Sequence, residues 1–108
     1  MASETWIRIV IYRIEGKPDV AAIEYMKSSV QEVVRRLETQ PGFQLGYWGS
    51  SPETGTMAAV TYWSSRDAIT RATASLTQLH AERAAQGLVV HKAHNVRLFA
   101  GASVGALH

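Results

Sequence analysis

Apolar and polar residues follow two different periods along this chain, and together the periods predict four strands and two helices. Four stretches are rich in β-branched and aromatic residues and end near glycine, proline or other turn-forming residues, which is typical of strands. These stretches are Trp6–Ile14, Phe43–Ser50, Met57–Trp63 and Leu88–Phe99. Residues 51–55, with the sequence SPETG, favour a turn that joins the middle two as an antiparallel hairpin.

The stretch between the first two strands has apolar residues three and four positions apart, which is the period of an amphipathic helix. Pro18 and Asp19 suit its first turn. The amides of the first turn donate no hydrogen bond within the helix, so the N–H that proline lacks is not missed there, and the positive end of the helix dipole favours the negative charge of the aspartate. Pro41 and Gly42 end the helix. One side of it is expected to face a core through six residues: Ile23, Met26, Val30, Val33, Val34 and Leu37.

A second helix is expected between the third strand and the last one. Ser64, followed by Asp67, forms a capping-box pattern at its start, and Gly87 suits its C-terminal end. Its apolar stripe consists of Ile69, Ala72, Leu76 and Leu79. The resulting βαββαβ order is the split βαβ arrangement of ferredoxin-like folds, so the fold class is α+β with one antiparallel sheet. Right-handed crossovers place the first and third strands in the centre and both helices on one face.

The first strand is apolar on both of its sides, which bears on assembly. One side carries Trp6, Arg8, Val10, Tyr12 and Ile14, and the other carries Ile7, Ile9, Ile11 and Arg13. A sheet with helices on one face only should alternate apolar with polar residues, because its other face meets water. Since apolar patches of this kind are rarely left open, we expect a second copy of the sheet to cover it in a homodimer.

Length and composition place the chain among single-domain globular proteins. Its 108 residues are 46% hydrophobic and 19% charged, so we expect one domain over residues 1–108, with a core at about 5–99 and a flexible tail at 100–108. The net charge is only +2 and the basic residues are dispersed, which disfavours nucleic-acid binding. The chain has no cysteine, which excludes disulfides and thiolate chemistry. Without a signal-peptide pattern or a long apolar run, it is expected to be cytoplasmic with no membrane partner.

Three short segments resemble a known family: Pro41-Gly42-Phe43, residues 60–68 with the sequence VTYWSSRDA, and His80. They are similar to the antibiotic biosynthesis monooxygenase (ABM) superfamily of dimeric α+β barrels, and the resemblance extends from Trp6 to Phe99. It implies a homodimer with an apolar pocket in each subunit between the sheet and the helices. Cofactor-free members oxygenate polycyclic phenols in that pocket. Other members bind or degrade haem, isomerise small lactones or have no known activity.

In a cofactor-free reaction, the substrate's own anion gives an electron to O₂, and the protein supplies a dry cavity and groups that favour the anion. His80, at the edge of the second helix's apolar stripe, is the candidate base, because an imidazole takes a phenolic proton near neutral pH. Tyr12 and Arg8 share one side of the first strand and are the candidates that stabilise the anion. Alternatively, His80 only covers the core, and Arg8 forms an ion pair between subunits.

Four aromatic residues are candidates for substrate binding: Trp63, Tyr62, Trp48 and Tyr47. They stack against a flat substrate in the functional interpretation and fill the core in the alternative one. No metal site is expected. His91 and His94 are three residues apart on a strand, so they point to opposite faces and cannot bind one ion together.

The chain departs from both well-characterised branches of the superfamily. The haem-degrading branch has an asparagine in the first strand and a tryptophan in the second helix, where this chain has Ala72 and its neighbours. The phenol-oxygenating branch has an asparagine and a tyrosine near the positions of Ala59 and Ile69. The leading hypothesis is a cofactor-independent monooxygenase for a flat aromatic or polyketide-like small molecule. The alternatives are a haem-binding protein that uses His80 and a non-catalytic dimeric binding or interaction module.

Overall fold

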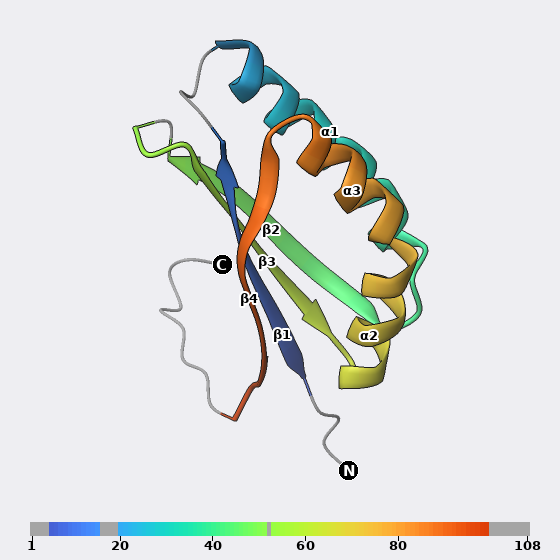
Figure 1. Ribbon diagram of the computed structural model, residues 1–108. Helices are drawn as coiled ribbons and strands as arrows, with labels where there is room; N and C mark the ends of the chain where they lie inside the picture. The colour runs from blue at the N-terminus through green and yellow to red at the C-terminus, as the bar shows by residue number, and fades with distance from the viewer. Residues whose placement is uncertain (1–4, 16–19, 52, 100–108) are drawn as a thin grey trace, which may run out of the picture.

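The computed structural model describes residues 5–15, 20–51 and 53–99, which form one antiparallel sheet with helices on one of its faces (Figure 1). The elements in chain order are β1 (Trp6–Ile14), α1 (Val20–Glu38), β2 (Phe43–Ser51), β3 (Thr56–Trp63), α2 (Arg66–Ser75), α3 (Thr77–Ala85) and β4 (Leu88–Arg97). The strand order is β2-β3-β1-β4, with all neighbouring strands antiparallel. This confirms the α+β, ferredoxin-like class and the central position of β1 and β3.

The second predicted helix differs in two ways from the expectation. It is divided into α2 and α3 at Leu76, although its apolar stripe continues across the break and stays buried. Its N-cap is Ser65, whose extended backbone lets the hydroxyl accept a hydrogen bond from the amide of Ala68 at 3.1 Å. The assignment of Ser64 as the capping residue was therefore wrong by one position.

Two glycines end the helical segments as expected. Gly42 and Gly87 have φ values of 89° and 92°, a backbone conformation that residues with a Cβ rarely adopt. Gly42 is also needed for a close approach, since an added Cβ would lie 2.6 Å from the Cβ of Ala68. Pro18, Asp19 and residues 100–108 lie outside the described residues.

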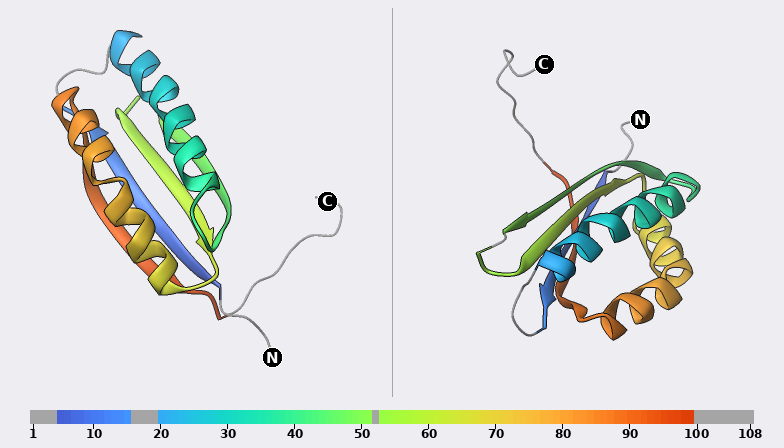
Figure 2. Two further views of the ribbon diagram at one scale, coloured as in Figure 1. Left: turned by 90° about the vertical axis from the view of Figure 1, so that its right-hand side faces the viewer. Right: turned by 90° about the horizontal axis from the view of Figure 1, so that it is seen from above.

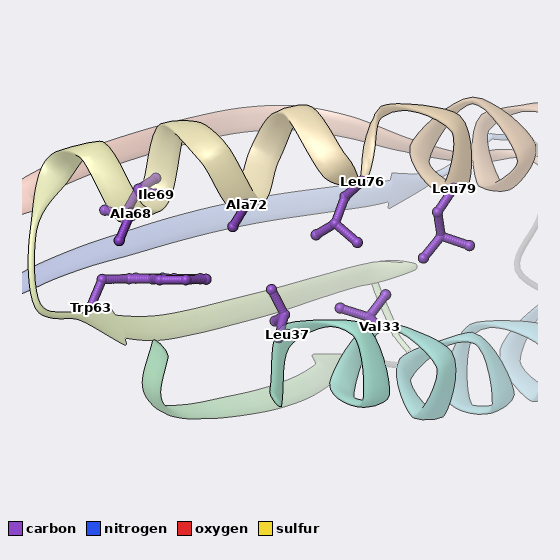
Figure 3. Close-up of a cluster of buried hydrophobic side chains, with 8 residues drawn as sticks. All are labelled: Val33, Leu37, Trp63, Ala68, Ile69, Ala72, Leu76 and Leu79. Atoms are coloured by element: carbon purple, nitrogen blue, oxygen red, sulfur yellow. The ribbon is translucent and has the colours of Figure 1, made fainter. Parts of the chain in front are cut away.

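The helices cover one side of the sheet, called here the inner face, and the core lies between them (Figure 2). Val33 and Leu37 of α1 and the apolar stripe of α2 and α3 point toward the layer that holds the ring of Trp63 (Figure 3). Trp63 is only 1% exposed. Burial of each large aliphatic side chain in this layer contributes about 1.5–3 kcal/mol relative to leaving it exposed.

The opposite side of the sheet, called here the outer face, carries no helix (Figures 1 and 2). Strand pairing places eight residues on it: Ile7, Ile9, Ile11, Leu45, Tyr47, Val60, Tyr62 and Val96. Tyr47 is 66% exposed, and the isoleucines of β1 are half-buried. The apolar outer face expected from β1 is therefore present and extends over all four strands. In the described part of the chain, no helix is long and apolar enough to cross a bilayer.

Candidate functional site

A small cavity lies between the inner face and the helices. It measures about 30 Å³, which is room for about two waters and too little for an aromatic ring. Its polar lining comes from Arg8, Tyr12, Thr61, Thr73 and His80. Its remaining lining is aliphatic side chains and the rings of Trp48 and Trp63. Apolar walls with a few converging polar groups are the usual composition of a ligand site.

Five of the seven residues that the sequence singled out line this cavity: His80, Tyr12, Arg8, Trp63 and Trp48. The other two, Tyr47 and Tyr62, lie on the outer face, because they pair with Val60 and Ile7 in the sheet. The structure thus separates the predicted site residues into an inner group and an outer pair.

His80 is held by α3 against the ring of Tyr12. The two ring centroids are 6.4 Å apart with an angle of 63° between the planes, an edge-to-face arrangement. Burial lowers the pKa of His80 below its ordinary 6.5, and the charges of Arg83 and Arg8 lower it further. The imidazole is therefore neutral at pH 7, which is the form that accepts a proton.

Arg8 projects from β1 on the same face as Tyr12 and is half-buried. Its Nη1 donates a hydrogen bond of 3.1 Å to Oδ1 of Asn95 on β4. Burial lowers the pKa of Arg8, while the nearby Tyr12 raises it; an arginine nevertheless stays charged in a protein. Because this side chain lines the cavity and its hydrogen-bond partner is neutral, it is available to an anion.

Arg83, which the sequence analysis missed, does not line the cavity but adjoins it through the ring of Tyr12. It is 2% exposed, and its Cζ lies 4.7 Å from the ring centroid of Tyr12. Its buried Nε has no hydrogen-bond partner. A sequence signal was available: Arg83 continues the apolar stripe of the second helical segment four residues after Leu79, at a position that points inward.

Trp63 serves mainly as core. Its Nε1 donates a hydrogen bond of 2.8 Å to the Thr61 hydroxyl, and its ring packs edge-to-face on Phe43 with centroids 5.2 Å apart. The core interpretation therefore describes most of its contacts, while part of the side chain also borders the cavity.

Trp48 borders two spaces. On one side lies the small cavity, and on the other lies a groove of about 270 Å³ between α1 and the β2–β3 hairpin. Met26, Val30 and Met57 make this groove largely apolar. Gly46 leaves room for the indole, because an added Cβ would lie 2.7 Å from Cη2 of Trp48. Trp48 is thus the wall between the cavity and the groove.

Among the described residues, no three histidine or acidic side chains are grouped so that they could hold a metal ion. His94 pairs with Ile9 and so lies on the outer face, away from His80.

Comparison with models of known protein families and with curated proteins found no match. Solved structures do match. MupZ from Pseudomonas fluorescens has a TM-score of 0.71 and 10% identity, over 88% of this chain and 69% of that one. The cofactor-independent oxygenase SnoaB from Streptomyces nogalater has a TM-score of 0.64 and 18% identity, over 96% and 99% of the two chains. A candidate antibiotic biosynthesis monooxygenase from Chloroflexus aurantiacus has a TM-score of 0.63 and 13% identity, over 94% and 99%. These neighbours bear out the resemblance to ABM-like proteins at the level of the fold.

Proposed function

We propose that this chain, which has the fold of ABM-like monooxygenases, binds a flat aromatic or polyketide-like molecule between its sheet and its helices and oxygenates it without a bound cofactor. One observation carries the proposal: a neutral His80 and a half-buried Arg8 meet at one apolar cavity beside the hydroxyl-bearing ring of Tyr12. A proton acceptor and a cation in a dry site are what this reaction needs from a protein. The structural neighbour SnoaB is a cofactor-independent oxygenase, which agrees with the proposal.

In the proposed reaction, His80 takes a proton from an acidic CH₂ or phenol group, and Arg8 and Tyr12 stabilise the resulting anion. The anion gives one electron to O₂, and the two radicals combine to form a C–O bond. The proton held by His80 then returns to the peroxide. Loss of the second proton from the same carbon breaks the O–O bond, so CH₂ and O₂ become C=O and water.

The size of the cavity requires a rearrangement before a ring can bind. We propose that the ring occupies the groove and displaces Trp48, which joins the groove to the cavity. The joined space is comparable to the smallest ligand pockets, which measure about 300 Å³. Met26 and Met57 suit this use, because thioethers make favourable contacts with aromatic rings.

We further propose that the chain works as a homodimer in which the outer faces of two copies pack together. Tyr47 and Tyr62 then belong to the interface, where aromatic residues are common, and do not belong to the substrate site.

The small cavity also favours a second candidate, a non-catalytic binding or interaction module, since the site is closed to rings until Trp48 moves.

Haem does not fit. A tetrapyrrole is far larger than the cavity, and the His80 ring already packs against Tyr12. We therefore expect hemin titration to produce no Soret shift that depends on His80.

Oxygen uptake with anthrone, a tricyclic ketone with an acidic CH₂ group, tests the proposal. After the spontaneous oxidation is subtracted, we expect turnover that incorporates one ¹⁸O atom from ¹⁸O₂. His80→Ala is expected to slow it by about 10²–10⁴-fold, the usual contribution of a general base. Binding of anthrone without uptake favours the binding module. Uptake that survives His80→Ala removes His80 as the base.

A further inference from the structure

Arg83 carries a buried charge that no acidic group compensates in the described part of the chain. The residue is 2% exposed, and the contact that its guanidinium makes among the described residues is with the ring of Tyr12. The ring attracts the cation but accepts no in-plane hydrogen bond, and Nε remains without an acceptor. A buried arginine is ordinarily paired, because an isolated charge is costly to remove from water. Arg83 therefore lacks an anionic partner.

A second cation lines the cavity itself, which Arg83 adjoins through the ring of Tyr12. Arg8 lines the cavity, and its recorded hydrogen bond goes to the neutral amide of Asn95. His80 packs against the same tyrosine ring, and its pKa is lowered by burial and by the charges of both arginines. Two permanent cations and an imidazole thus surround the ring of Tyr12, and the recorded ion pairs of the described residues lie elsewhere, at Glu32 on α1.

The cavity beside these groups has the right size for a small anion. Its volume of about 30 Å³ gives room for about two waters, and the two oxygens of a carboxylate need similar space. The planar fork of a guanidinium matches a carboxylate, which can accept from two arginines at once. A single phenolate oxygen would leave more of these donors without an acceptor.

We infer that the ligand of this site is an aromatic carboxylic acid. Its carboxylate enters the cavity and binds Arg8, close to the charge of Arg83 on the ring of Tyr12, while the ligand's ring lies against Trp48. The aromatic part rests on the proposed function. The carboxylate site itself does not depend on oxygenation.

Calorimetric titration with 2-naphthoate, its methyl ester and 2-naphthol tests the inference. We expect 2-naphthoate to bind at least tenfold more tightly than the ester, and this preference to disappear in Arg83→Gln. Arg83→Met is a second variant, which keeps an unbranched apolar stem and removes the buried charge, so that loss of fold and loss of charge are told apart. Arg35→Gln, at an exposed arginine of α1, is the matched control and should keep the preference.

The outcomes separate the two proposals. Equal binding of 2-naphthoate and its ester overturns the carboxylate site and leaves the flat ligand intact. If no aromatic probe binds, acetate followed by NMR of Tyr12 and His80 decides: shifts that require Arg83 support the carboxylate site and overturn the aromatic ligand. No shift with acetate overturns both.

Discussion

The two faces of the sheet use apolar residues for different purposes. The inner face is covered by the protein's own helices, and the polar side chains on it, such as Arg8 and Thr61, converge on one cavity. The outer face carries apolar side chains on all four strands, and Tyr47 and Leu45 are exposed there. Some polar groups thus lie where water is excluded, and several apolar groups lie where water would have access, beside Lys92 and His94 of β4.

This contrast teaches where the chemistry and the association belong. A polar group on a covered face is costly unless it has a partner, so the unpaired Arg83 indicates a ligand. An apolar face that is open to water is rarely left uncovered, and this supports the proposed homodimer. Changes to one face should therefore alter ligand binding or folding, and changes to the other should alter assembly.

The largest expected effect separates two neighbouring residues of β3. Trp63→Ala leaves a cavity in the inner core and is expected to lower the free energy of unfolding by about 3–5 kcal/mol, measured by urea denaturation. Tyr62→Ala, one residue earlier on the outer face, should cost less than half as much. Only the Tyr62 effect should grow with protein concentration, because Tyr62 lies in the proposed dimer interface. Equal losses at the two positions would show that both faces are covered within one chain.

Next in size is an effect on assembly. Ile9 lies in the middle of the outer face, paired with Val60 and His94. In a dimer, Ile9→Glu buries an unpaired charge, which costs about 3–5 kcal/mol and weakens association by more than about 100-fold. Sedimentation velocity at micromolar concentration should show a dimer for the wild type and for Ile9→Val, and a monomer for Ile9→Glu. A monomeric wild type would show that no second copy covers the outer face.

A smaller effect tests which serine caps the N-terminus of α2, over the inner face. Ser65→Ala removes the hydrogen bond to the amide of Ala68 and should lower the free energy of unfolding by about 1 kcal/mol. Ser64→Ala is the matched control, with an expected change within about 0.5 kcal/mol, because its side chain is exposed and caps nothing. A larger loss of stability in Ser64→Ala than in Ser65→Ala, measured by urea denaturation, would show that Ser64 is the cap.

The elements could be predicted from the sequence because their signals are local. β1 has the predicted bounds, Trp6–Ile14, since a run of β-branched residues needs no tertiary information. The cap could not be resolved in the same way, because two adjacent serines offer the same hydroxyl.

The site was predicted only in part, because its geometry depends on contacts between distant segments. A register irregularity between Phe43 and Leu45 turns Trp48 inward and Tyr47 outward, and simple alternation from Phe43 would give the opposite result. The burial of Arg83 is equally non-local, since an arginine on a helix is ordinarily solvated and only the packing of α3 over β1 places this one on Tyr12.

The smallest expected effect concerns the pH dependence of stability. The folded protein lowers the pKa of His80 through burial and through the charges of Arg83 and Arg8, so folding favours the neutral imidazole. The unfolded chain then binds more protons, and this contribution to stability is fully present above the ordinary pKa of 6.5 and is lost as the pH falls through the folded value. The wild type should accordingly lose more stability than His80→Gln between about pH 7.5 and 5.5.

Removal of one arginine should sharpen this result. In Arg83→Met the pKa of His80 should rise toward its ordinary value, because one of the two positive charges near it is gone while its burial remains. An NMR titration of the His80 ring measures this rise directly, and Arg35→Gln on the surface of α1 should leave the titration unchanged. If the His80 titration is the same in the wild type and in Arg83→Met, the charge of Arg83 does not act on His80, and the space between the sheet and the helices holds one effective cation, Arg8.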